Sequence, residues 1–258
     1  LSIMTPKEVE NKSGRTPKEQ LECIYSAVRP LIGTRDTVYH DLNQQLVEKG
    51  VRDVPYESLA GAEKSAIQQY YKDNIRPLLS PQIIDPSHPF PHLKNKVLYA
   101  AAVLTDKNRA FLGIVGLPES IPPILFLPNK SCEFVRTETI LAAHLKKIFR
   151  IYTLEEQSII SVTRNADLSY DEEKFDDDIP DFRKHMEKLL KLRERLAPVR
   201  LEMQGFAPRL QQLLCQRLKL QNSQCYHSTC PLSLDYAYLL NRCDPSLYYP
   251  PHIPQYPL

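Results

Sequence analysis

Glycine is scarce in this sequence, and its scarcity excludes one kind of phosphate site. Seven glycines among 258 residues is well under half of the usual ~7%. They are spread from Gly14 to Gly205, so they form neither a G-x-x-x-x-G-K loop nor a G-x-G-x-x-G loop. A glycine-rich loop that cradles phosphates is therefore excluded within the chain.

Long apolar runs and a strong net charge are also missing. No apolar run approaches the ~18 residues of a membrane-spanning helix. A signal peptide would have an apolar run directly after its first charged residues, and this sequence has none there. We expect neither feature. The 33 Lys and Arg residues against 31 Asp and Glu leave a net charge of +2, so a polyanion would have to bind local clusters of cations. The six cysteines are an ordinary density for a reduced protein.

Proline, in contrast, is abundant, with 22 residues, and it is concentrated with tyrosine at the end of the chain. Residues 248–258 read Y-Y-P-P-H-I-P-Q-Y-P-L, which is typical of a linker. Because the chain also begins at Leu1 rather than at a methionine, we expect it to be a segment of a longer protein.

The first predicted element is a long amphipathic helix. Thr16 and Glu19 form a capping-box pattern around Pro17, and Gly50 is a good terminating residue. Apolar residues recur between 21 and 46 at intervals of three and four. Pro30 predicts a kink, because it removes one backbone donor. The one-sided pattern leaves two interpretations open, packing on the chain's own domain or contact with a partner.

The remaining elements predict an α+β fold in which helices flank a mixed β-sheet. Two apolar runs around a short turn, 97–104 and 110–115, predict a buried hairpin. Further strands are predicted at 51–54, 124–127, 132–135, 158–163, 199–203 and 225–227, and further helices at 58–78, 137–149, 180–196, 208–218 and 233–240.

Four segments, taken in order, carry a family resemblance. They are L-L-S-P-Q-I-I-D-P-S-H-P-F-P at 78–91, S-V-T-R-N-A-D-L at 161–168, V-R-L-E-M at 199–203, and C-P-L-S-L at 230–234 with Y-Y-P-P behind it. Together they resemble the middle, or head, domain of the bacterial polyphosphate kinase family over residues 14–258. The resemblance implies a leader at 1–13 from a preceding domain, the head domain at 14–240, and a linker at 241–258 toward a catalytic domain.

The resemblance also implies an activity. The family reversibly transfers the terminal phosphate of ATP to long-chain polyphosphate through a phosphohistidine. Its nucleophilic histidine and its magnesium-binding arginines belong to later domains, and its nucleotide-contacting asparagine belongs to an earlier one. We therefore assign no catalytic, cofactor-binding or metal-binding residue within this chain, and we expect ATP and Mg²⁺ to bind outside it.

The partners implied by the family are a second copy of the chain in a homodimer or a higher assembly, polyphosphate, and the N-terminal and C-terminal domains of the same enzyme. The head domain of the family serves dimerisation and helps to enclose the polyphosphate tunnel. We expect a cytoplasmic location, with peripheral contact at the inner face of the membrane as an alternative.

Several residues suggest metal binding, but their spacing argues against it. His88 and His92 are separated by three residues, yet the intervening prolines prevent a helix. Cys225, Cys230 and Cys243 lack a paired C-x-x-C spacing. The acidic run at 167–178 lacks the central glycine of a calcium loop, and it is better explained as the solvated start of the helix at 180–196. We predict no metal site.

Arg164 is the one candidate for a polyphosphate contact. It ends a predicted strand, where its guanidinium could bind phosphate oxygens or an internal carboxylate such as Asp167. Lys94, Lys96 and Arg200 are weaker candidates of the same kind.

Two other classes of protein compete with this interpretation. The long helix and the Pro/Tyr-rich tail would also suit a non-catalytic protein-interaction module. A nucleic-acid binder is disfavoured by the charge of +2 and by the lack of interleaved basic and aromatic residues.

Overall fold

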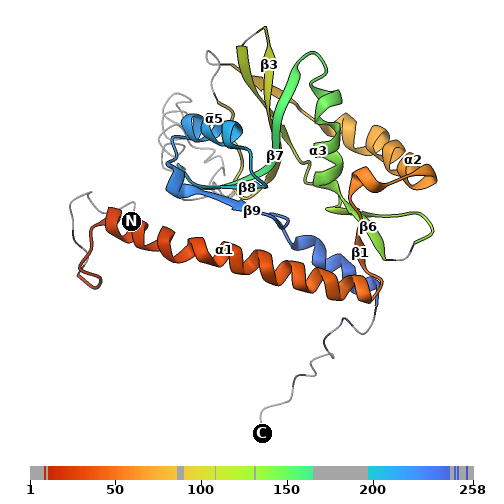
Figure 1. Cartoon of the computed structure of the whole chain (residues 1–258), viewed down its shortest axis with the longest axis horizontal. Coiled ribbons are helices and arrows are strands. Elements are labelled where there is room, and N and C mark those ends of the chain that lie inside the picture. The colour runs from red at the N-terminus through yellow and green to blue at the C-terminus, as the bar shows by residue number, and fades with distance from the viewer. Residues whose placement is uncertain are drawn as a thin grey trace, which may run out of the picture.

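The computed structural model shows an α+β protein with two mixed sheets and flanking helices (Figure 1), which confirms the predicted fold class. The structure describes residues 9, 11–85, 90–107, 109–130, 132–164, 197–244, 247, 249 and 254. The predicted helix at 180–196 lies outside these residues. Within the described part, no helix combines the length and apolar character needed to cross a membrane.

The larger sheet has six strands in the order β2-β4-β3-β7-β8-β9. All neighbours in it are antiparallel except β8 and β9, which are parallel. Its strands are β2 (Gln82–Ile84), β3 (Leu98–Asp106), β4 (Arg109–Gly116), β7 (Thr153–Arg164), β8 (Pro198–Gln204) and β9 (Cys225–Ser228). The predicted hairpin is confirmed as β3–β4.

The smaller sheet has three strands in the order β1-β6-β5. They are β1 (Arg52–Asp53), β5 (Ile124–Phe126) and β6 (Glu133–Arg136), with β1 parallel to β6 and β5 antiparallel to it. Arg136 lies at the centre of a buried ion triad here, since its Nε donates to Asp53 at 2.6 Å and its Nη1 to Glu138 at 2.9 Å. Burial opposes the charge of Arg136, but the two carboxylates raise its pKa.

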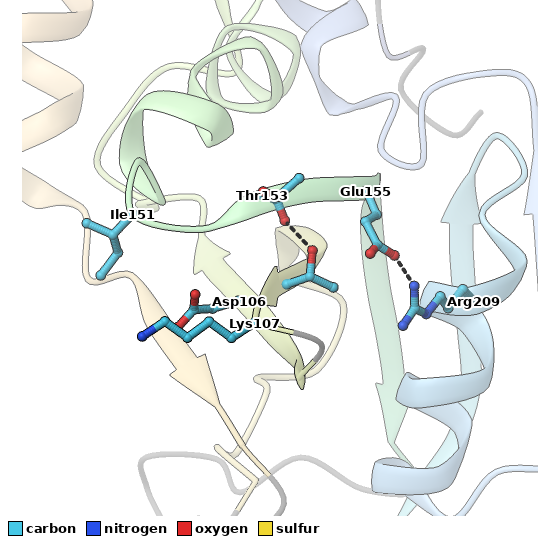
Figure 2. A pocket seen from close by; sticks show the side chains of 7 residues that line it. Asp106, Lys107, Ile151, Thr153, Glu155 and Arg209 are labelled. Carbon is cyan, nitrogen blue, oxygen red and sulfur yellow. Dashed lines mark hydrogen bonds and ion pairs between the residues drawn. The ribbon is translucent and has the colours of Figure 1, made fainter.

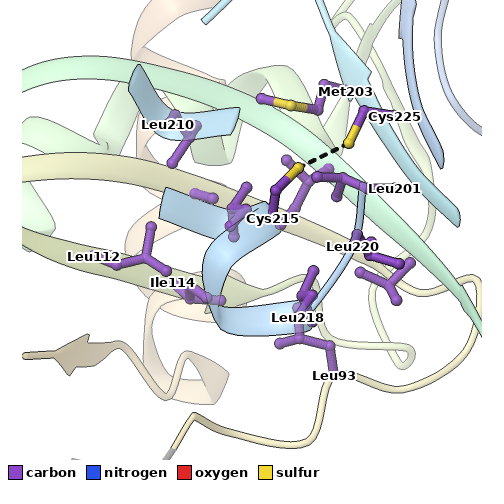
Figure 3. Packing of buried hydrophobic residues seen from close by; sticks show 14 of the residues in the cluster. Leu93, Leu112, Ile114, Leu201, Met203, Leu210, Cys215, Leu218, Leu220 and Cys225 are labelled. Atoms are coloured by element: carbon purple, nitrogen blue, oxygen red, sulfur yellow. Dashed lines mark hydrogen bonds between the residues drawn. The ribbon is translucent and has the colours of Figure 1, made fainter. Parts of the chain in front are cut away.

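Helices cover both faces of the larger sheet. The helices and turns of the structure are α1 (Pro17–Glu48), η1 (Tyr56–Ser58), α2 (Gly61–Tyr70), η2 (Tyr71–Ile75), η3 (Arg76–Leu78), α3 (Thr137–Ile148), α5 (Pro208–Leu218), η5 (Asn222–Gln224) and η6 (Asp235–Arg242). Ala101 and Val103 of β3 pack toward Leu210 and Leu214 of α5 (Figure 3 shows this layer). Ala100 and Ala102 belong to the layer formed with α3. The apolar run is continuous because successive strand residues point to opposite faces and both faces are buried.

The predicted helix at 58–78 is wrong in detail. It begins after Ala60 rather than near Ser58, and it divides into α2, the π-helical turn η2 and the 3₁₀ turn η3. The π turn buries both Tyr71 and Ile75, which an uninterrupted α-helix places about 40° apart on its surface. The helix predicted at 233–240 is a 3₁₀ helix, Asp235–Arg242.

The long helix α1 begins as predicted, with both hydrogen bonds of the capping box between Thr16 and Glu19. Pro30, where a kink was expected, lies inside one uninterrupted helix. The helix runs along one side of the molecule beside β9 and η6 (Figure 1). None of its residues, all of which the structure describes, is fully buried.

Polar side chains attach α1 to the rest of the domain. Arg29 donates from Nη2 to the Ser223 carbonyl at 2.9 Å, and the Tyr39 and Tyr236 hydroxyls are 3.1 Å apart. The Asp36 carboxylate accepts from the Ser228 hydroxyl at 2.7 Å and from the Thr229 backbone N–H at 2.5 Å. Partial burial opposes ionisation of Asp36, but these hydrogen bonds and those from Cys230 and the Thr229 hydroxyl lower its pKa to about 2.

Asp36→Asn should lower the free energy of unfolding by about 1–2 kcal/mol, because an amide replaces a charged acceptor of several hydrogen bonds. The folded-state pKa of Asp36 lies below its ordinary value of 3.8. The contribution is therefore complete above about pH 4 and is lost as the pH falls toward about 2. Urea unfolding at pH 7 and pH 3 measures both effects.

The matched control for this prediction is Asp41→Asn, which changes an exposed carboxylate in the same helix. It should leave the unfolding free energy within about 0.5 kcal/mol of the native value. Equal losses in the two variants would contradict the role given to Asp36.

Candidate functional site

Arg164, the predicted polyphosphate contact, ends strand β7 and is held by the segment before β3. Its Nε donates to the Leu93 carbonyl at 2.6 Å, and its backbone N–H donates to Asn95 Oδ1 at 2.9 Å. Leu93 is itself buried in the layer under α5. The guanidinium therefore fixes the chain between the His-Pro motif and β3. Asp167, the carboxylate expected beside it, lies outside the described residues, and the phosphate contact stays a prediction.

The weaker candidates lie near the same end of the sheet. Lys94 pairs with Glu119 at 2.9 Å, both side chains being about two-thirds exposed, and the Lys96 backbone N–H donates to the Val162 carbonyl at 2.8 Å. Arg200 faces Thr163 across β7 and β8.

Arg200 is nevertheless directed to different partners. It donates to Glu202 at 2.7 Å, and its guanidinium lies 4.4 Å from the centre of the Tyr226 ring. Glu202 in turn binds Arg35 of α1 at 3.4 Å. The structure therefore gathers the four candidates at one sheet end, but it directs Arg200 toward α1 and Arg164 toward the layer under α5.

The three cysteines considered for zinc have separate surroundings. Cys225 Sγ lies 2.8 Å from Cys215 Sγ beneath α5 (Figure 3), and burial raises the pKa of Cys225 to about 12. Cys230 Sγ lies 3.1 Å from Asp36, and the Cys243 carbonyl accepts from Cys132 Sγ at 3.4 Å. Over the described residues, no group of three or more His, Cys, Asp or Glu side chains is arranged to hold a metal ion. His88 and the acidic run at 167–178 lie outside them.

Three of the described histidines are engaged in hydrogen bonds within the fold. His144 is 3% exposed, its Nδ1 donates to the Ile140 carbonyl at 2.8 Å, and its ring stacks on Tyr71 at 3.7 Å between centres. Burial lowers its pKa. His227 bonds to Gly205 and Gln211 through its two ring nitrogens, and His40 bonds to Thr229. His144 and His227 have both ring nitrogens engaged, since the Tyr56 hydroxyl also lies 3.5 Å from His144 Nε2.

One cavity, of about 550 Å³, lies between the β3–β4 turn and the start of β7. Figure 2 shows its lining, which includes Asp106, Lys107, Glu155 and Arg209. Glu155 and Arg209 form an ion pair across it. Because its lining carries two acidic and two basic residues, this cavity offers little net charge to a ligand.

A second cavity, of about 750 Å³, lies between the end of α2 and the end of α3. Its lining contains four cationic side chains and no acidic one: Lys72, Arg76, Lys147 and Arg150. We call it the basic groove. Sequence reasoning missed it, although the i, i+4 spacing of Lys72 and Arg76 was a readable signal that they share one helix face.

Comparison with known proteins identifies the domain. Residues 62–240, more than two thirds of the chain, match the family model described as the polyphosphate kinase middle domain. The chain belongs to the polyphosphate kinase family. The polyphosphate kinase of Halalkalibacterium halodurans is 32% identical over 239 residues, which are 90% of this chain and 33% of that protein. That of Streptomyces coelicolor is 31% identical over 256 residues, 96% of this chain and 33% of that protein.

A solved structure agrees at the level of the fold. The crystal structure of polyphosphate kinase from Porphyromonas gingivalis aligns with a TM-score of 0.65 and 19% identity, over 93% of this chain and 35% of that one. This polyphosphate kinase domain therefore spans about a third of the length of these relatives.

Arg164→Ala should lower the free energy of unfolding by about 1–2 kcal/mol, because the Leu93 carbonyl loses a charged donor. Lys94→Ala removes only an exposed ion pair and should cost less than about 0.5 kcal/mol. Urea denaturation of the two variants provides the comparison, and an unchanged midpoint in Arg164→Ala would show that the bond to Leu93 is dispensable.

Proposed function

We propose that this chain is the middle domain of a polyphosphate kinase that reversibly transfers the terminal phosphate of ATP to polyphosphate. The observation that carries the proposal is the match of residues 62–240 to the family's middle domain. In this proposal the phosphohistidine, ATP and Mg²⁺ all belong to parts of the enzyme outside this chain. The engagement of both ring nitrogens of His144 and of His227 in hydrogen bonds within the fold supports that division.

The segment itself then serves assembly and domain packing. Four apolar residues of α1, Ile24, Leu31, Val38 and Leu42, are 48–60% exposed. Their spacing of seven and four places them along one stripe, which lies beside the face that carries Asp36 and Tyr39 to the domain. We assign this stripe to contact with a second copy of the chain. Arg164 remains a proposed contact for polyphosphate.

The isolated chain should neither form polyphosphate nor become phosphorylated on histidine. Phosphoryl transfer needs an accessible acceptor in line with the leaving oxygen and neutralisation of the phosphate charges. Incubation with radiolabelled ATP and Mg²⁺, followed by assays for polymer and for acid-labile phosphate, tests this. The full-length enzyme is the positive control, and acid-labile label on His88, His92 or His144 in the isolated chain would overturn the proposal.

Leu31→Lys and Leu42→Lys should together weaken self-association at least tenfold. Each buried leucine contributes about 1.5–3 kcal/mol to an interface, and lysine adds unpaired charge. Leu46, the last apolar residue of the pattern between 21 and 46, packs against the cluster around Phe134 and Tyr236 and is unsuitable for this test. Sedimentation equilibrium measures the dimer constant.

The control for self-association is Gln44→Lys, which adds one lysine at an exposed position of α1 on the side away from the stripe and is compared with each single leucine variant. It should leave the dimer constant unchanged. A native chain that sediments as a monomer at tens of micromolar would exclude the dimer and favour the alternative, in which the stripe binds a different protein.

A further inference from the structure

The basic groove concentrates positive charge in a protein whose net charge is small. The chain carries a net charge of only +2, yet four cations and no acid line this one cavity. All four side chains are exposed, and within the described residues none of them takes part in an ion pair. Asp73, the nearest acid in sequence, instead accepts from Gln69 Nε2 at 2.8 Å.

Helix electrostatics explain only part of this arrangement. Lys147 lies in the last turn of α3, where a cation is stabilised by the helix dipole, and Arg150 follows that end closely. Lys72 and Arg76 likewise lie near the carboxyl end of the continuous helical stretch formed by α2, η2 and η3, so the dipole accounts for each cation separately but not for the gathering of all four. Lys72 and Arg76 lie four residues apart, a spacing at which like charges repel, and they share the cavity lining with Lys147 of α3 and with Arg150, which follows that helix. An anion between the two helices would remove the repulsion.

Two stacked aromatic side chains form part of the groove lining next to the cations. Tyr71 and His144 line the groove and stack with ring centres 3.7 Å apart, and the Nδ1 bond to Ile140 fixes the imidazole. The π-helical turn buries Tyr71 and Ile75 while leaving Lys72 and Arg76 exposed. Such turns occur frequently at functional sites. The exposed cations therefore lie next to a pair of aromatic side chains that is held in place by the fold.

We propose that the basic groove binds a linear chain of three or more phosphate units. A cavity of about 750 Å³ has room for more than a single orthophosphate, and a phosphate chain presents oxygens along its length to guanidinium and ammonium groups. The choice of phosphate over other linear polyanions rests on the proposed function. Both inorganic polyphosphate and the triphosphate of a nucleotide share this chemistry.

The basic groove and Arg164 are separate points on the domain. Strand β7 begins three residues after Arg150 and carries the chain to Arg164, an extended length of about 36 Å over eleven steps. A variant in the groove therefore leaves the surroundings of Arg164 intact, and the two contributions to binding can be measured independently.

The test uses the 258-residue chain and tripolyphosphate in isothermal titration calorimetry at about 50 mM and 200 mM salt. The native chain should bind, and binding should weaken with salt, as expected of charge neutralisation. R76Q combined with K147Q should weaken binding about tenfold or more and reduce the salt dependence. K146Q combined with K49Q removes the same charge from exposed positions outside the groove and should change binding less than twofold.

Equal weakening by the two double variants, or no binding by the native chain at about 50 mM salt, would overturn the proposal. Orthophosphate that binds as tightly as tripolyphosphate would also overturn it, because a chain would then bring no advantage. With ATP as the ligand, binding equal to that of tripolyphosphate supports recognition of the phosphate chain from either source. Tight binding of ATP with none of tripolyphosphate would show that the nucleoside is read instead.

The outcome is separable from that of the proposed function. A full-length enzyme that makes polyphosphate while both double variants bind tripolyphosphate alike would leave the function standing and remove the groove site. A groove that binds tripolyphosphate selectively in a protein without kinase activity would do the reverse.

Discussion

The side chains of β3 alternate between two apolar layers, and the rest of the structure depends on both layers being covered. Val103 enters the layer under α5, and Leu104 enters the layer under α3. Gly113 on the adjacent β4 lets Phe149 approach closely, since a Cβ there would lie 2.9 Å from that ring. Because neither face of the sheet could be left to solvent, the positions of α3 and α5 are fixed, and with them the positions of the groove and of Arg164.

Helix α1 is attached mainly by polar contacts rather than by apolar packing. Its contacts are hydrogen bonds and ion pairs from Arg29, Arg35, Asp36 and Tyr39 to loops and strand ends, with Leu46 packed at the edge of one apolar cluster. This arrangement specifies the register of the helix on β9 precisely, while it leaves the apolar stripe beside the contact free. The same helix can therefore hold its own domain with one face and offer another face to a partner.

Much of the fold was readable from the sequence because its signals are local. The capping box at Thr16 and Glu19 and the β3–β4 hairpin needed only pattern and turn chemistry. The π turn after Tyr70 was not readable, since Tyr71 and Ile75 would share one face of an ordinary α-helix as well. The first half of β7 was missed because the residues before Ser158 are polar and partly exposed, without the apolar run that marks a buried strand.

The candidate site was less predictable than the fold. Motifs pointed to the family and to Arg164, but the bond from Arg164 to the Leu93 carbonyl joins residues 71 apart. The four cations of the basic groove come from two segments, 72–76 and 147–150, that lie about 70 residues apart in sequence, and only the folded chain brings them to one cavity. Local spacing gives the face of one helix, but not what lies opposite.

The sparse attachment of α1 has a kinetic consequence. Regions with few buried apolar contacts open at a free energy below that of global unfolding. Since α1 buries none of its residues fully while residues 100–104 of β3 are 0% exposed, we expect the helix to open as a separate cooperative unit over an intact sheet. Its amide hydrogens accordingly exchange through these local openings, and those of β3 only when the whole domain unfolds.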